Sequence, residues 1–352
     1  MSTSDVGKDG LRGERPGREA EVGGGLRRRG RKRGRHRGEK AMVPDAEFTS
    51  YYGKPILNPP VWKASDVAAY FFLGGLAGAG SVLAAGAQLT GRPVTARALK
   101  ISSVAALGGS TAALIHDLGR PERFLNMLRV MKPTSPMSMG SWLLAAYGPA
   151  AGAAAVLDVT GLFPRLGGAA TLGAAALGPA VCTYTAVLAA DTAVPAWHEA
   201  HRELPFVFAG SAVAAASGMA LIAAPRREAG PMRTAAVFGA ALELAAAKLL
   251  ERRAGLAAEP YKEGKAGRFV RAGEILSAAG IAGSVLLGGR GPSGRRGPSG
   301  GFGRAAAALS GAALLAGSAC TRFGVFHAGI QSARDPKYTV IPQRERLRAA
   351  GG

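Results

Sequence analysis

Apolar runs of about 18 to 25 residues recur along this chain, and a helix of that length crosses the roughly 30 Å hydrocarbon core of a bilayer. Ala and Gly supply much of these runs, and the 52 glycines indicate helix packing through small residues, as in Gly74-x-x-x-Gly78. A large soluble helical protein would need polar stripes every 3.6 residues, and few are present. The pattern therefore predicts an all-α integral membrane protein.

The apolar runs predict eight transmembrane helices. They occupy residues 66–89, 97–115, 141–156, 169–190, 206–224, 234–250, 272–287 and 305–326. We expect a disordered basic tail (1–45), an interfacial arm (46–65), a transmembrane domain (66–326) and a polar C-terminal tail (327–352). An even number of spans places both termini and the motif-like connections on one side of the membrane, so function is expected at that face.

The formal net charge of +21 is concentrated in particular segments. A basic surface attracts nucleic-acid phosphates, but much of this charge lies in the tail segment 26–40, without the aromatic residues of a base-stacking surface. We therefore expect no nucleic-acid partner. The tail is not a secretory signal, because no apolar stretch follows Lys40 before Asn58. A true start at Met42 is a hypothesis that the mass of the native protein tests.

Cysteine and histidine usage limits the redox centres that the chain could hold. An iron–sulfur cluster takes four thiolates, whereas the two cysteines, Cys182 and Cys320, both lie inside apolar runs. A membrane cytochrome b needs paired axial histidines on facing helices. The histidines near span boundaries, none of them mid-span, are His116, His198, His201 and His327. We therefore predict no haem and no iron–sulfur cluster in this chain.

Several ionisable residues lie near the ends of the expected helices. His116 and Asp117 follow the second apolar run, and Asp66 and Tyr70, four residues apart, share one face at the start of the first. With Tyr184 of the fourth run, they form a set of proton donors and acceptors near one face. Such a set suits a quinone, whose redox reaction moves two electrons and two protons.

Each of these residues also has a structural explanation. Asp66 could simply cap its helix, and His116 and Asp117 could reach from a helix end to water. Tyr184 alone is more often a packing residue whose hydroxyl is hydrogen-bonded. These alternatives stay open at this stage.

Two carboxylates lie within the later spans, where an ionisable residue is a functional candidate because burying it in a membrane is costly. Glu243 lies near the middle of the sixth expected helix with Lys248 about one turn beyond, and Glu274 opens the seventh. A buried structural pair of Glu243 and Lys248 is favoured, and a proton path through Glu243 and Glu274 is the alternative.

A set of short motifs occurs in a fixed order. The motifs are FFLGGLAG in the first expected helix, HDLGRP (116–121), SPMSMGSW (135–142), AVPAWHE (193–199), LERRAGLAAEPY (250–261) and SARDPKYTV (332–340). Together, from Tyr51 to Arg346, they resemble the membrane subunit of polysulfide reductase, the NrfD-like family. Their joint occurrence in order is far more specific than any single motif.

The resemblance implies two four-helix bundles that hold no redox centre and bind a quinone, such as menaquinone, as substrate. It also implies an iron–sulfur partner subunit of the four-cluster ferredoxin type, docked to a molybdopterin catalytic subunit, and a multi-pass location in the plasma membrane of a prokaryote. The family's quinone contacts correspond here to Asp66, Tyr70, His116, Asp117 and Tyr184. Relatives carry an Asn and a His in the first helix, where this chain has Val67 and Tyr70.

The expected docking residues for the partner are Arg120, Arg123, Trp197 and His198. Lys and Arg are slightly enriched on the motif-bearing side, which favours the cytoplasm, whereas in the best-understood member of the family that side is periplasmic. The face is therefore left open. Labelling of cysteines introduced at Ser135 and Ser293 with an impermeant reagent would decide it.

Two other functions remain as alternatives. A secondary transporter or proton channel would show broken helices at corresponding positions of two repeats, and no clear inverted repeat is visible. A purely structural anchor would tether a partner enzyme without binding quinone, and binding of a quinone analogue separates it from a quinone-reactive subunit.

Overall fold

The computed structural model describes residues 5–7, 10–12, 56–120, 122–286 and 301–350. The chain divides into two compact units, residues 60–332 and the remainder. The remainder contains two short antiparallel strands, β1 (Asp5–Gly7) and β2 (Gly10–Arg12), and helix α12 (Lys337–Ala350). The other residues of the tail that was predicted to be disordered, and the interfacial arm up to residue 55, lie outside the described residues.

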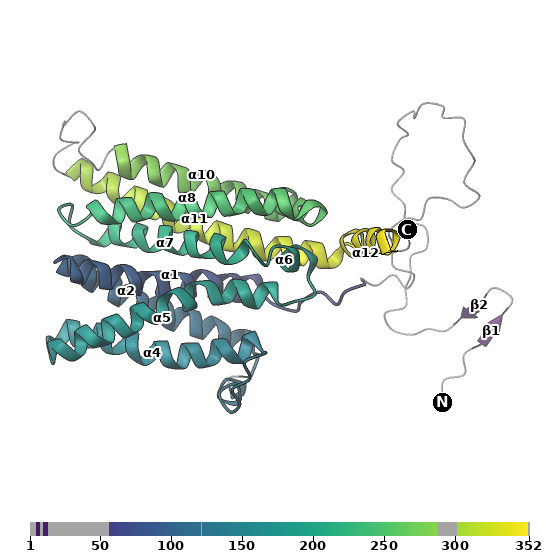
Figure 1. Cartoon of the computed structure of the whole chain (residues 1–352), viewed down its shortest axis with the longest axis horizontal. Helices are drawn as coiled ribbons and strands as arrows, with labels where there is room; N and C mark the ends of the chain where they lie inside the picture. The colour runs from purple at the N-terminus through teal and green to yellow at the C-terminus, as the bar shows by residue number, and fades with distance from the viewer. Residues whose placement is uncertain (1–4, 8–9, 13–55, 121, 287–300, 351–352) are drawn as a thin grey trace. The chain divides into compact units, whose positions relative to one another are not determined.

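The larger unit is helical (Figure 1). Its longer helices are α1 (Ala64–Leu89), α2 (Pro93–Asp117), α4 (Pro136–Thr160), α5 (Pro164–Ala190), α7 (Leu204–Ala223), α8 (Gly230–Arg253), α10 (Gly264–Leu286) and α11 (Gly301–Arg334). The short elements are α3 (Arg123–Asn126), α6 (Pro195–Glu199), the 3-10 helix η1 (Gly255–Ala258) and α9 (Glu259–Lys262).

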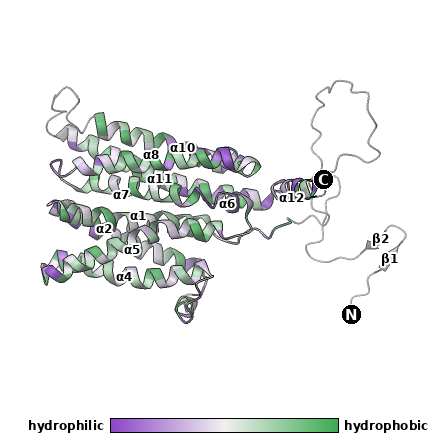
Figure 2. Ribbon diagram, viewed as in Figure 1, coloured by the Kyte–Doolittle hydropathy of each residue, from purple (hydrophilic) through white to green (hydrophobic). Residues whose placement is uncertain are grey.

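Within the described part of the chain, seven helices are long and apolar enough to cross a membrane: α1, α2, α4, α5, α7, α10 and α11. Green, the colour of hydrophobic residues, recurs along these helices in Figure 2. The prediction of an all-α membrane protein is thus confirmed. Helix α8 takes the place of the sixth expected span; it carries Arg, Glu and Lys residues and is not among the seven. The count of eight spans and the division into two four-helix bundles remain predictions.

Two sets of helices pack together in the larger unit. Helices α1, α2, α4 and α5 contact one another and form what we call the first helix group. Helices α7, α8, α10 and α11 form the second helix group, in which glycines bring the backbones together, and α1 and α7 join the groups. A side chain on Gly78 of α1 would meet the carbonyl oxygen of Gly178 of α5 at 2.5 Å, so these two helices touch through their backbones.

Local sequence explains where the helices around the candidate site begin and end. Gly119 adopts a left-handed conformation (φ +69°) just beyond the end of α2, which glycine allows without steric cost. Ser135 caps α4, its hydroxyl accepting a hydrogen bond from the Ser138 N–H at 3.5 Å, and Pro136 occupies the first helical position. The motifs HDLGRP and SPMSMGSW therefore mark one helix end and the next helix start.

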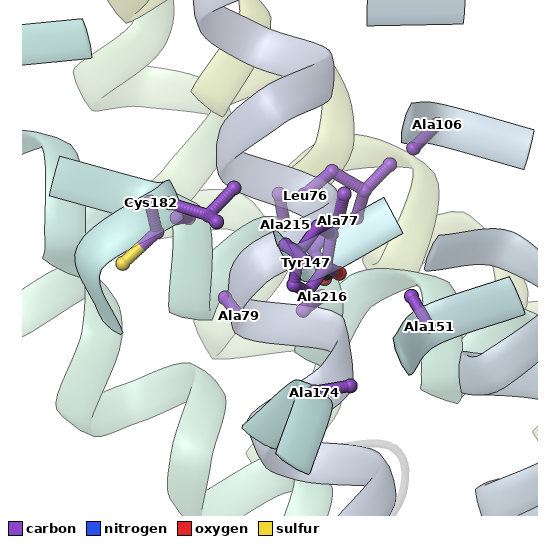
Figure 3. Close-up of a cluster of buried hydrophobic side chains, with 12 residues drawn as sticks. Leu76, Ala77, Ala79, Ala106, Tyr147, Ala151, Ala174, Cys182, Ala215 and Ala216 are labelled. Atoms are coloured by element: carbon purple, nitrogen blue, oxygen red, sulfur yellow. Dashed lines mark hydrogen bonds between the residues drawn. The ribbon is translucent and has the colours of Figure 1, made fainter. Parts of the chain in front are cut away.

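The core of the first helix group centres on Tyr147, which is fully buried (Figure 3). Its hydroxyl donates a 2.6 Å hydrogen bond to the Ala77 carbonyl and lies 2.7 Å from the Ser81 hydroxyl. A buried phenol needs such partners because an unpaired polar group in an apolar interior is costly. The surrounding residues are mainly alanines, which permit the close packing of helices expected from the sequence.

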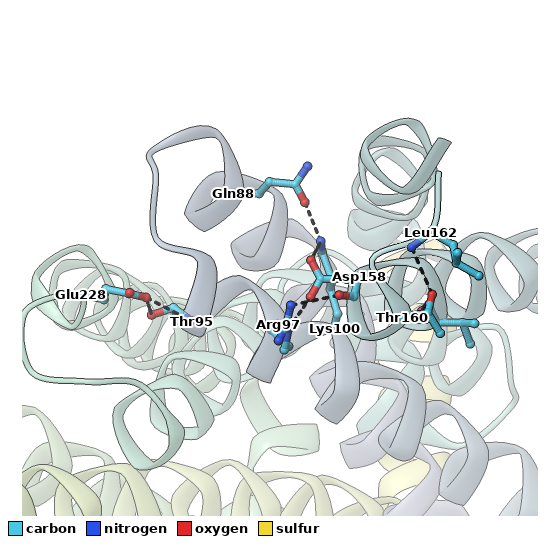
Figure 4. A network of polar contacts seen from close by, with 9 residues as sticks. Gln88, Thr95, Arg97, Lys100, Asp158, Thr160, Leu162 and Glu228 are labelled. Atoms are coloured by element: carbon cyan, nitrogen blue, oxygen red, sulfur yellow. Dashed lines mark hydrogen bonds and ion pairs between the residues drawn. The ribbon is translucent and has the colours of Figure 1, made fainter. Parts of the chain in front are cut away.

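A polar network closes the other end of the first helix group (Figure 4). Asp158 of α4 accepts from Arg97 and from the buried Lys100 of α2, each at 2.9 Å, and Lys100 also donates to Gln88. Gln88, Lys100 and Asp158 border an open pocket beside the start of α5. Glu228, in the connection before α8, accepts two 2.8 Å hydrogen bonds from Thr95 of α2 and so ties the two helix groups together.

Candidate functional site

The candidate site begins with a contact between the first turn of α1 and the last turn of α2. Nδ1 of His116 lies 2.8 Å from Oδ2 of Asp66. The Asp66 side chain is 12 % exposed and that of His116 is 68 % exposed, so the imidazole reaches solvent while the carboxylate is covered. The residue that caps α1 is Lys63, without a side-chain capping bond, so Asp66 does not serve as the helix cap. Instead its carboxylate holds a histidine from the neighbouring helix.

Asp117 has a different role from its neighbour. Its Oδ1 accepts a 3.3 Å hydrogen bond from the backbone N–H of Lys63, the residue just before α1. This bond fixes the end of α2 against the start of α1. Arg120, suggested above as a partner of Asp117, is exposed, and among the described residues no ion pair joins the two.

Two tyrosines lie one helical turn below Asp66. Tyr70 of α1 is 3 % exposed, and its hydroxyl is hydrogen-bonded to that of Tyr184 from α5. The tip of the Tyr184 ring occupies the space that a side chain at Gly140 of α4 would fill. Glycine at this position of the SPMSMGSW motif therefore allows Tyr184 to reach Tyr70.

The five residues predicted to contact a quinone thus lie at one end of the first helix group. Asp66 and Tyr70 are four residues apart on α1, about 6 Å along the helix axis at 1.5 Å per residue. The Asp66–His116 pair forms an outer layer and the Tyr70–Tyr184 pair an inner layer. Such an arrangement can donate hydrogen bonds to one oxygen of a bound molecule and exchange a proton with another.

The AVPAWHE motif contains α6, which is bound to the second helix group. Trp197 is fully buried, and its indole N–H donates a 2.7 Å hydrogen bond to the Val325 carbonyl of α11. Its ring stacks on Trp62 at 5.6 Å and fills the space beside Gly329. Trp197 was expected to dock a partner, but its side chain is covered by this chain and instead positions α6 beside the start of α1.

The other expected docking residues differ in exposure. Arg120 and His198 are exposed, and the imidazole ring of His198 lies 6.0 Å from that of His201. Arg123 begins α3, but its side chain lies outside the described residues. The exposed members therefore follow the C-terminal ends of α2 and α5, at the same end as Asp66 and His116.

An ion pair fixes the connection between α6 and α7. The buried Glu203 accepts from Arg253 Nη2 at 2.8 Å, and the same nitrogen donates to the Glu199 carbonyl. The Arg253 guanidinium holds the pKa of the Glu203 carboxyl below its usual range. Tyr261 adds a 3.0 Å hydrogen bond to the Ala196 carbonyl. Through these bonds LERRAGLAAEPY holds AVPAWHE in place.

The two later carboxylates lie in the second helix group. Glu243 is 4 % exposed, and its Oε1 accepts a 2.6 Å hydrogen bond from Thr321 of α11. The suggested pair of Glu243 with Lys248 is wrong. Lys248 instead pairs with Glu251 at 3.1 Å and with Glu274 of α10 at 3.2 Å, because its side chain points outward from α8.

Two residues of structural importance were not singled out from the sequence. Arg322 of α11 is fully buried, although a charge inside the last apolar run is the same signal that singled out Glu243. Gly140 has no such signal, because its role depends on Tyr184 from another helix.

The fold defines a multi-span helical membrane protein with a polar site where α1 begins and α2 ends. Residues 56–157 match the family model described as Polysulphide reductase, NrfD. The match supports an NrfD-like membrane subunit and confirms the resemblance for the three motifs inside this segment, FFLGGLAG, HDLGRP and SPMSMGSW. The matched segment includes Asp66, Tyr70, His116, Asp117 and Gly140. No curated protein matches the chain.

Proposed function

We propose that this chain is the quinone-binding membrane subunit of a multi-subunit oxidoreductase and exchanges electrons with an iron–sulfur partner subunit. The observation that carries the proposal is the 2.8 Å contact between Asp66 and His116, one turn above the paired hydroxyls of Tyr70 and Tyr184. These residues combine a proton acceptor with hydrogen-bond donors at one helix end. Most of them lie in the segment that matches the NrfD family model.

The Asp66 carboxylate determines which nitrogen of His116 is available. As an acceptor it favours a proton on Nδ1, which leaves Nε2 free to accept a proton from a quinol hydroxyl. Oxidation of a quinol breaks two O–H bonds and releases two protons, while two electrons pass to the partner. His116 is mostly exposed and can return each proton to water. One hydroxyl of the Tyr70–Tyr184 pair donates to the other, so the accepting tyrosine keeps its own proton free to donate a hydrogen bond to the other oxygen of the head group. Reduction follows the reverse order.

In this proposal the chain itself holds neither haem nor an iron–sulfur cluster. The partner is a subunit with four ferredoxin-like clusters, joined to a molybdopterin subunit, and it docks on the exposed residues Arg120 and His198. The complex lies in the plasma membrane of a prokaryote. The family match and the position of both residues at the end that bears Asp66 support this arrangement.

Binding of a fluorescent quinone analogue to the purified full-length chain tests the proposal. We expect Tyr184→Phe to weaken binding about fivefold to tenfold, because a hydrogen bond from a hydroxyl is worth about 1 to 1.5 kcal/mol. Tyr147→Phe is the matched control, since this buried tyrosine lies away from the site and should leave binding unchanged. An absence of binding by the unaltered chain would favour the structural anchor, and transport of a solute without binding of the analogue would favour the transporter.

A further inference from the structure

A second polar centre lies between the two helix groups and has no part in the proposed quinone chemistry. Glu243 of α8 and Arg322 of α11 are both buried, at 4 % and 0 % exposure. Oε1 of Glu243 accepts from Thr321, whereas Oε2 has no hydrogen-bond partner among the described residues. We call Glu243, Thr321 and Arg322 the buried acid centre.

The guanidinium of Arg322 is held by α7 and lies against α1. Nη2 donates a 2.6 Å hydrogen bond to the Phe208 carbonyl of α7, and the guanidinium carbon lies 3.7 Å from the centre of the Phe208 ring. On the other side, a side chain at Gly75 of α1 would approach Nη2 to 3.0 Å. Glycine at this position of FFLGGLAG therefore makes room for the arginine. Nε and Nη1 have no partner among the described residues.

The charges around Glu243 decide which group can titrate. Arg322 faces it from α11, Glu274 faces it from α10, and Cys182 of α5 faces Arg322 from the first helix group. No direct ion pair joins Glu243 to Arg322 within the described part of the chain. A guanidinium keeps its proton in proteins, whereas a buried carboxylate without a close counter-ion is relieved by protonation. Glu243 is therefore the titrating member.

We propose that Glu243 binds and releases one proton in the buried interior of the protein while Arg322 remains charged. Uptake forms an O–H bond at Oε2 and leaves a neutral carboxyl, release breaks that bond, and no electron moves. Water is the donor and acceptor. Glu274, whose side chain is 30 % exposed and pairs with Lys248 at 3.2 Å, is the ionisable group of α10 that faces Glu243. This second site does not depend on quinone binding.

Infrared difference spectra of the full-length chain in lipid nanodiscs, recorded across a pH titration without quinone, test the proposal. We expect a carbonyl band of a buried carboxylic acid that appears as the pH falls and shifts in heavy water. The band should be lost in Glu243→Gln. It should move to higher frequency in Thr321→Val, because Thr321 donates its hydroxyl hydrogen to the carboxyl group.

Glu251→Gln is the matched control, since Glu251 lies on the same helix and pairs with Lys248 on the outside. It should leave the band unchanged. Circular dichroism checks that each variant keeps its helices, and Thr321→Val decides the outcome if Glu243→Gln does not fold. A band that survives Glu243→Gln, a band that ignores Thr321→Val, or the lack of any such band while the protein stays folded would each overturn the proposal.

Discussion

At the scale of single residues, the candidate site depends on pairs that come from different helices. His116 is oriented by Asp66, and Tyr184 meets Tyr70 in space left free by Gly140. In each pair one side chain is covered and fixes the position of the other. Substitutions that keep the fold but disturb one member should therefore affect quinone chemistry more than stability.

Replacing His116 with Gln should lower quinol oxidation by the purified complex at least a hundredfold. The amide cannot accept a proton, and a positioned general base typically contributes 10²- to 10⁴-fold. Turnover with a soluble quinol analogue measures the effect. His201→Gln is the matched control, because His201 is exposed and its Nδ1 faces only the His198 carbonyl. Equal turnover in both variants would remove His116 from the mechanism.

A methyl group at Gly140 should displace the Tyr184 ring, because the new carbon would occupy the position of the ring tip. We expect Gly140→Ala to reduce quinol turnover by about tenfold to a hundredfold, since small displacements of positioning groups have effects of that size. Gly152→Ala on the same helix is the control, with no atom within 4 Å of the added carbon. If both variants turn over alike, Tyr184 has no positioning role.

At the scale of secondary-structure elements, helix ends are fixed by polar bonds and helix middles by small residues. Asp117 ties the end of α2 to Lys63, and the Glu203–Arg253 ion pair ties the start of α7 to the end of α8. Between the ends, Gly78 and Gly178 allow α1 and α5 to touch. The two kinds of contact should respond differently to pH and to added volume.

The ion pair gives stability a dependence on pH. Because the pKa of Glu203 is lowered in the folded protein, its contribution is present above the ordinary carboxyl pKa and is lost as the pH falls through the lowered value. Glu203→Gln should therefore lower the thermal midpoint near neutral pH and have a smaller effect in acid. Glu263→Gln, at an exposed position, should show no such trend. A pH-independent loss at Glu203 would contradict this account.

Added volume at the contact of α1 and α5 should destabilise the first helix group. Gly78→Ala would place a carbon 2.5 Å from the Gly178 carbonyl oxygen, and overpacking of this kind costs about 1 to 3 kcal/mol. Gly86→Ala, on the same helix with no atom within 4 Å, should be neutral or stabilising by about 0.5 to 1 kcal/mol. Thermal unfolding in detergent compares them, and similar midpoints would argue against backbone contact.

At the scale of the whole molecule, the number of membrane crossings depends on whether α8 crosses the membrane. If it does, the chain crosses the membrane eight times, as the sequence predicts. The connection before α8 then lies on the opposite side of the membrane from α9. Its charged residues lower its hydropathy, and it is not among the seven apolar helices. Within the protein it packs closely on α7, where Gly210 and Gly239 bring the two backbones together.

Cysteine labelling resolves this point. In a chain with Cys182→Ala and Cys320→Ala, single cysteines at Arg227 and Glu263 should react with an impermeant reagent from opposite sides of oriented vesicles. Both positions are exposed and flank α8. Reaction from the same side would reduce the count to seven. The earlier pair of positions, Ser135 and Ser293, tests the same count, although Ser293 lies outside the described residues.

The amino-acid sequence by itself determined the class of protein and the helix ends at which the candidate site lies. The length of the apolar runs requires membrane helices, and the motifs mark helix ends, because Gly, Pro and Ser act locally on the backbone. Contacts between helices were decided only by tertiary structure. These include the turn of Asp66 toward His116, the burial of Trp197, the outward direction of Lys248 and the contact of Glu243 with Thr321. The physical reason is that each depends on which helices are neighbours and how they are rotated, which the spacing of residues along one helix does not specify.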